Sequence, residues 1–122
     1  HWSAEVGEAR DQRGANLRLM RDEHVTLLVG SDSPNIGLPA GSGIHMELAE
    51  LVDAGLSRSD ALRAATWDNS RFLDPDANFG AVRVGWEADL VLVEGDPTTD
   101  LRALEQIVGL WTDGRRVTRN AR

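Results

Sequence analysis

The segment 25–30 constrains the fold of this chain more than any other stretch. Its apolar residues form a near-continuous run rather than an alternating one: Val25, Leu27, Leu28 and Val29. Such a run is typical of a parallel strand that is covered on both faces. Gly30 ends the run and lets the backbone turn. The sequence therefore predicts one buried strand that delivers Asp32 to an open loop.

Asp32 is the first candidate for a catalytic residue. In α/β barrels and open α/β sheets, the reactive side chains lie on the loops that follow the carboxyl ends of strands. Asp32 has this position, but an Asp before Ser33-Pro34 is also a good turn former. Since turn Asp residues outnumber catalytic ones, the pattern alone leaves both interpretations open.

The composition excludes several functional classes. The 122 residues suffice for one domain with a core, but they are about half the length of a closed eight-stranded α/β barrel. The net charge of −7 makes nucleic acid and anionic membranes poor partners. Because Cys and Lys are both absent, this chain offers no disulfide, no thiolate metal site and no Schiff-base lysine.

The ends of the chain and its hydropathy also carry expectations. No apolar run approaches the length of a membrane span, and no segment resembles a signal peptide, so we expect a cytoplasmic protein. The chain begins at His1 rather than at Met. We therefore expect a processed, tagged or truncated chain, or the ordered part of a longer one.

Helices are predicted on both sides of the strand. A helical pattern covers roughly residues 12–22, and a second helix is expected at 43–54, with Gly55 as its stop signal. Ser57 and Asp60 resemble a capping box that opens a helix at 58–66. Residues 66–70 are expected to break this helix before one further turn that ends at Leu73.

The loop 33–42 has two Pro and two Gly, a composition suited to a binding loop. Asn35, Ser42 and His45 are candidates for substrate contact at its edge. A His at the start of a helix is more often a capping or solvated group, so that interpretation of His45 stays open, and Ser42 is also a plausible N-cap. A small-molecule binding domain that uses the segment 33–45 is a further hypothesis.

The C-terminal part is predicted to be a small β unit. Strands are expected at 81–84, 89–93 and 107–112, and Asp113-Gly114 is a typical two-residue hairpin loop into 116–118. The turn 95–97 and a helical turn at 101–104 separate the second strand from the third. We therefore divide the chain into residues 1–74, with the buried strand and its flanking helices, and residues 75–122, with the β unit.

The order of the motifs resembles the C-terminal third of the amidohydrolase superfamily, in the branch of imidazolonepropionase-like and prolidase-like hydrolases. The motifs are a strand ending in Gly30-Ser31-Asp32, His-x-Glu-Leu from His45, "DAGLSRSDALRAAT", "FGAVRVGWEADLVLVEGDP" and "VGLWTDGRRV". The resemblance covers roughly residues 12–118. It implies an α/β fold in which 25–30 is the last strand of a (β/α)8 barrel and 80–118 belong to a β-sandwich.

The same resemblance implies a role for Asp32. In the family, the Asp after the last strand binds a divalent metal, most often zinc, and accepts a proton from the water that attacks a carbonyl carbon. This implies hydrolysis of an amide, a cyclic amide or an amidine-like C–N bond in a small-molecule substrate. Asp89 resembles a structural position at the start of a sandwich strand, and no chemistry is assigned to it.

The sequence departs from the family in its metal ligands. The family's His-x-His pair, its bridging Lys or Glu and its two further His have no counterparts here, and a divalent site needs three or more ligands. We expect Asp32 alone to hold no metal tightly and the chain alone to be inactive. The alternative hypothesis is a non-catalytic structural or interaction fragment that self-associates or needs a companion chain with the remaining ligands.

Overall fold

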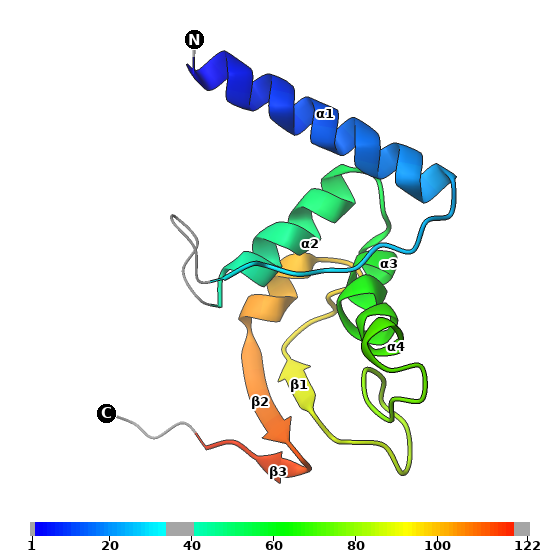
Figure 1. Ribbon diagram of the computed structural model, residues 1–122. Coiled ribbons are helices and arrows are strands. Elements are labelled where there is room, and N and C mark those ends of the chain that lie inside the picture. The colour runs from blue at the N-terminus through cyan, green and yellow to red at the C-terminus, as the bar shows by residue number, and fades with distance from the viewer. Residues whose placement is uncertain (1, 34–40, 119–122) are drawn as a thin grey trace.

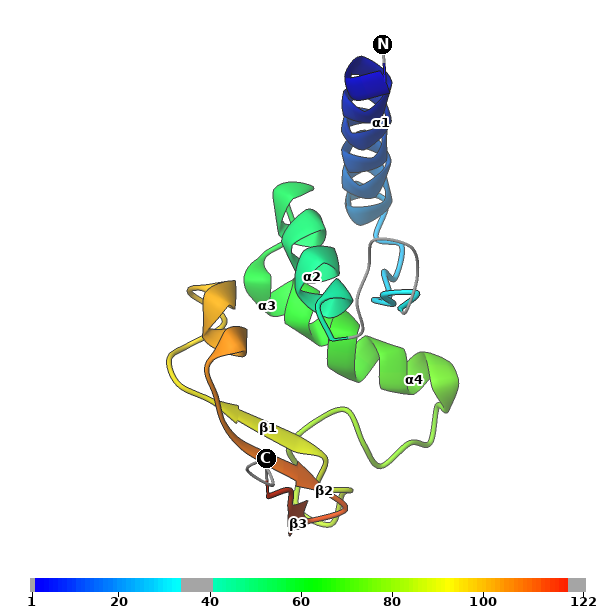
Figure 2. The ribbon, with the colours of Figure 1, turned by 90° about the vertical axis from the view of Figure 1, so that its left-hand side faces the viewer.

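The computed structural model describes residues 2–33 and 41–118, and it shows an α/β chain with a small antiparallel sheet (Figure 1). The helical elements are α1 (Trp2–Asp22), α2 (Gly43–Asp53), α3 (Arg58–Arg63), η1 (Ala64–Asp68), α4 (Asn69–Leu73) and η2 (Leu101–Glu105). The strands are β1 (Leu90–Val93), β2 (Ile107–Thr112) and β3 (Arg115–Arg116). The helices gather toward one end of the molecule and the sheet lies at the other (Figure 2).

Helix α1 confirms the helix predicted at 12–22 and begins ten residues earlier, at Trp2. The added stretch has no apolar stripe but is rich in Ala, Glu and Arg, which have high intrinsic helix propensity. Two polar contacts join α1 to α2 and to the turn that follows α2. Arg13 pairs with Glu50 of α2 at 3.0 Å, and Arg21 Nη1 donates to the Gly55 carbonyl at 2.8 Å.

The core lies where α2 and α3 meet the segment that follows α1. Helix α2 and its stop at Gly55 are confirmed, since Gly55 has φ +97° and its N–H donates to the Val52 carbonyl. The predicted cap of α3 is also confirmed, because Ser57 Oγ accepts the Asp60 N–H at 3.0 Å. The buried apolar cluster comprises Val29, Leu48, Leu51, Leu56, Ala61 and Ala64.

The break predicted at 66–70 is wrong. Residues 58–73 are helical throughout, because a π-helical turn, η1, connects α3 to α4. Two hydroxyls bond back to the helix: Thr66 Oγ1 donates to the Leu62 carbonyl at 2.8 Å and Ser70 Oγ to the Trp67 carbonyl at 2.7 Å. The polar residues that indicated a break are accommodated by the wider turn and by these bonds.

Two predicted strands do not form within the described part of the chain. Residues 25–30 carry no ladder hydrogen bonds, and Val25 is 51% exposed. Residues 81–84 are irregular, and Val84 is fully exposed. A strand needs a partner backbone, and neither segment lies beside one among residues 2–33 and 41–118. Apolar patterning alone therefore overestimated the strand content.

The sheet confirms the rest of the predicted β unit, in the order β1-β2-β3. Leu90 pairs with Trp111 and Val91 with Leu110, and a bulge between Leu92 and Val93 shifts the register. The hairpin turn between β2 and β3 falls at Asp113-Gly114 as predicted, and Asp113 has φ +50°. Beyond the sheet, no helix in the described ranges has the length and apolar character needed to cross a membrane.

Asp89 has a structural role at this hairpin. Its Oδ1 accepts the N–H of Asp113 at 2.7 Å, and the neighbouring Ala88 carbonyl accepts the N–H of Gly114 at 3.1 Å. The carboxylate thus satisfies the backbone of a turn residue that sits in the left-handed region. This contact explains an Asp at the entrance to β1 without any catalytic role.

Replacing Asp89 by Ala removes the acceptor for Asp113 N–H and is expected to lower the free energy of unfolding by about 1 kcal/mol. Asp89→Asn keeps an oxygen acceptor and should lose less. Urea denaturation followed by circular dichroism measures both variants, with Asp76→Ala at an exposed loop position as the control. Equal stability of Asp89→Ala and the control would contradict the role.

Candidate functional site

The candidate site begins at Val29, which is 8% exposed and packs in the core. Both backbone polar groups of Val29 bond to one side chain, that of Asn69 at the start of α4. Asn69 Nδ2 donates to the Val29 carbonyl at 2.8 Å, and the Val29 N–H donates to Asn69 Oδ1 at 3.2 Å. Asn69 therefore takes the place that a neighbouring strand would have beside Val29.

Three residues later, the chain presents Asp32. Its side chain is exposed and its φ is +49°, in the left-handed region that few non-glycine residues adopt. Asp tolerates this region better than most residues, so the strain is modest. A non-glycine residue held in this region at a loop that follows a core residue is a feature found at functional sites.

Two serines flank the carboxylate. The Ser33 N–H donates to Ser31 Oγ at 3.3 Å, which closes a local turn around Asp32. Ser33 Oγ is shielded from solvent and has no hydrogen-bond partner among the residues that the structure describes. The hydroxyl of Ser31 thus closes the turn, and the carboxylate of Asp32 is exposed within it.

The other predicted site residues are not brought to Asp32 by the described structure. Asn35 lies outside the described residues. Ser42 occupies the N-cap position of α2 and is exposed, but its side chain makes no capping hydrogen bond. His45 is half-buried and lines a cavity of about 130 Å³ with Leu101 and Leu104 of η2. Their roles in substrate contact stay predictions.

The described residues do not supply a complete ligand set for a divalent metal. A metal site needs three or more ligands, and residues 2–33 and 41–118 include no group of three His, Cys, Asp or Glu side chains that could hold one. Asp32 supplies one carboxylate. The described residues therefore do not by themselves fit a metal centre.

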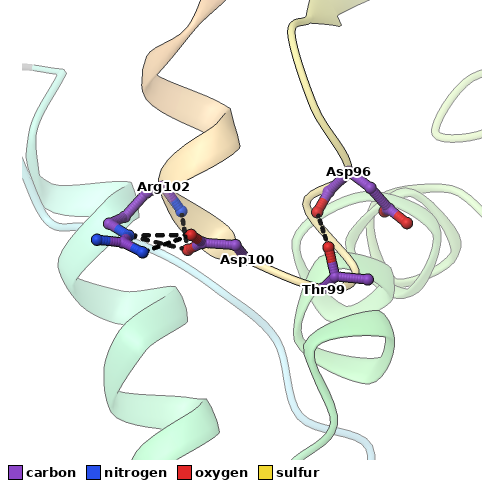
Figure 3. A network of polar contacts seen from close by, with 4 residues as sticks. All are labelled: Asp96, Thr99, Asp100 and Arg102. Atoms are coloured by element: carbon purple, nitrogen blue, oxygen red, sulfur yellow. Dashed lines mark hydrogen bonds and ion pairs between the residues drawn. The ribbon is translucent and has the colours of Figure 1, made fainter.

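The two carboxylates with lowered pKa values, those of Asp96 and Asp100, lie away from Asp32 in the sequence, on the connection between β1 and β2 (Figure 3). The hydrogen bond from the Thr98 side chain lowers the pKa of Asp96, and the hydrogen bond from the Arg102 side chain lowers the pKa of Asp100. Asp100 pairs with Arg102 at 2.7 Å and also caps η2 by accepting the Arg102 N–H at 3.0 Å. These contacts shape an exposed loop, and no substrate role follows from them.

The sequence pattern placed Asn69 only within the expected helix break at 66–70 and did not indicate its contact with Val29. The available signal was chemical, because an Asn side chain carries both a donor and an acceptor and can pair with a whole backbone unit. The partner of Asn69 lies 40 residues away in the sequence, so spacing could not reveal it.

Comparisons with known proteins agree with the architecture. The model of the amidohydrolase family matches residues 5–117. A Bifidobacterium longum protein described as a prolidase is 34% identical, with a TM-score of 0.80, and the match covers 87% of this chain and 26% of that one. Phenylurea hydrolase B is 26% identical, with a TM-score of 0.76, and the match covers 86% and 26%. No curated protein matches the chain.

A Xaa-Pro dipeptidase with bound methionine shares the fold at 24% identity and a TM-score of 0.75, over 87% of this chain and 25% of that one. The chain thus spans about a quarter of the length of these structures. The match to the family model covers far more than half of the sequence. The chain belongs to the amidohydrolase family, and within it the similarity to a prolidase supports the prolidase-like branch.

Proposed function

We propose that this chain contributes Asp32 to the active site of a metal-dependent amidohydrolase that cleaves an amide, a cyclic amide or an amidine-like C–N bond. The observation that carries the proposal is the placement of Asp32. The side chain of Asp32 is exposed and its backbone is in the left-handed region. It lies three residues after Val29, a core residue whose N–H and carbonyl are both hydrogen-bonded. Membership of the amidohydrolase family supports the same reaction class.

The proposal assigns Asp32 two roles: it is one ligand of a divalent metal, zinc in the first instance, and it accepts the proton of the attacking water. The metal would supply its usual chemistry, a water of lowered pKa. Because the described residues offer no complete ligand set, the remaining ligands come from outside this sequence, on a preceding segment or a companion chain. Asn35, Ser42 and His45 remain proposed substrate contacts.

In the same proposal, residues 1–74 form the end of a (β/α)8 barrel and residues 75–122 a part of a β-sandwich, in a cytoplasmic enzyme. The segment 25–30 then becomes the last barrel strand once neighbouring strands are present. The lack of ladder partners for this segment among the described residues and the exposure of Val25 and Leu28 are what such an arrangement predicts.

Asp32→Asn is expected to lower kcat by about a thousandfold or more in the assembly that carries the full ligand set, because the amide cannot accept the proton. The names of the similar structures supply the probe substrates: a Xaa-Pro dipeptide and a phenylurea. Product formation is followed by chromatography. The chain alone should give no turnover.

A matched control keeps this test specific. Asp76→Asn makes the same chemical change at an exposed loop position and should leave kcat unchanged. Circular dichroism checks that both variants fold. Near-normal turnover by a folded Asp32→Asn variant would contradict the catalytic role of Asp32.

A second candidate function is that of a non-catalytic interaction module. The sheet exposes large apolar side chains on β1 and β2, among them Val91 at 56%, Leu92 at 53% and Ile107 at 58%. Consecutive residues of a strand point to opposite faces, so Val91 and Leu92 leave both faces of the sheet uncovered. Exposed apolar patches of this kind mark surfaces that bind protein.

On this second reading the isolated chain self-associates, or binds a companion chain, through the sheet. Size-exclusion chromatography with light scattering should then give a mass above 13.3 kDa that rises with concentration. Val91→Lys with Ile107→Lys should return it to the monomer, whereas a pair of Lys substitutions at exposed positions of α1 should not. A sharp monomer at every concentration would count against the module.

A further inference from the structure

The two hydrogen bonds between Asn69 and Val29 connect parts of the chain that lie 40 residues apart in the sequence. Val29 is a core residue, and Asn69 begins α4 on the helical segment that follows α3. The two bonds, at 2.8 Å and 3.2 Å, use one donor and one acceptor of the same amide. Among side chains of this length only Asn offers both, since Asp is an acceptor only and Leu is neither.

The π-helical turn η1 sets the direction of the Asn69 side chain. The turn Ala64–Asp68 ends directly before Asn69, and a π turn contains one residue more than an α turn. An extra residue rotates every later side chain by about 100° around the helix axis. With regular α-helical geometry the Asn69 amide would therefore point away from Val29. Single π turns inside α-helices are frequent at functional sites.

The backbone conformation of Asp32 depends on the contacts that hold Val29. Between them, Gly30 is exposed, and a Cβ at Gly30 would meet no described atom within 4 Å, so packing cannot fix the chain there. Asp32 keeps its left-handed backbone only while the surrounding structure determines it. Along the chain, Val29 is the last residue before Asp32 that is both buried and bonded through its N–H and its carbonyl.

We propose that Asn69 is a positioning residue for Asp32: its amide stands in for a partner strand at Val29 and so fixes the direction in which the Asp32 carboxylate is presented. Asn69 acts through Val29 and does not itself touch the reacting atoms. The catalytic meaning of this role rests on the proposed function, whereas the clamp itself is a property of the chain that can be measured without substrate.

The first readout is amide hydrogen exchange in the chain itself. Asn69→Ala should raise the exchange rate of the Val29 N–H about tenfold or more, because both partners of this backbone unit are lost. Asn69→Asp keeps an acceptor for the Val29 N–H but sets a carboxylate oxygen against the Val29 carbonyl, so protection of the Val29 N–H should lie between that in the native chain and that in Asn69→Ala. Asn78→Ala, at an exposed loop position, is the matched control and should change nothing.

The second readout separates positioning from plain stabilisation. In Asn69→Ala the backbone order parameter of Asp32 should fall on the nanosecond timescale, while the amides of Leu48 and Leu51 in the core keep their exchange rates. Unchanged order at Asp32 despite a deprotected Val29 would overturn the proposal. If Asn69→Ala does not fold, Asn69→Asp decides. It removes the donor to the Val29 carbonyl, so the order parameter of Asp32 should still fall, and an unchanged order parameter would overturn the proposal.

The third readout is kinetic and uses the assembly that carries the full ligand set. Asn69→Ala should lower kcat by about tenfold or more with little change in KM, because a misdirected carboxylate affects the reaction step rather than binding. If Asp32→Asn retains activity, the proposed function fails while the exchange result still stands. If Asp32→Asn is inactive and Asn69→Ala keeps full kcat, the positioning role fails.

Discussion

Burial of Val29 requires that another part of the chain supply hydrogen-bond partners for its backbone. A core residue must have partners for its N–H and its carbonyl, since an unpaired buried backbone group costs on the order of 1–3 kcal/mol. The chain has no strand to offer at this point among its described residues, and Asn69 provides both partners. The π turn before Asn69, the cap at Ser57 and the stop at Gly55 all place α4 where this contact can form.

The sequence predicted those elements whose causes are local. Helix α2, its stop at Gly55, the cap of α3 and the hairpin at Asp113-Gly114 all follow from side chains within a few positions. No strand forms at 25–30 or 81–84 among the described residues, because strand formation requires a partner backbone, and patterning reports only that a segment prefers burial. Exposed Val82 and Val84 have the composition of a strand without its neighbour.

The candidate site shows the same division. Asp32 could be singled out because it follows a buried run, and its exposed, left-handed geometry is compatible with a presented carboxylate. Asn69 could not be singled out, because its contact spans 40 residues and depends on the rotation that η1 introduces. The large apolar side chains left exposed on β1 and β2 and the quarter-length match to related structures both fit an arrangement in which further chain completes the site.

We propose that Asp32 is one ligand of a metal site completed from outside these 122 residues. The most direct measurement is the metal content, by inductively coupled plasma mass spectrometry after exhaustive dialysis, of the assembly that carries the full ligand set. We expect retained divalent metal in the native assembly and at least tenfold less with Asp32→Asn, with Asp76→Asn unchanged. Equal retention by the native assembly and a folded Asp32→Asn variant would contradict the role of Asp32 as a ligand.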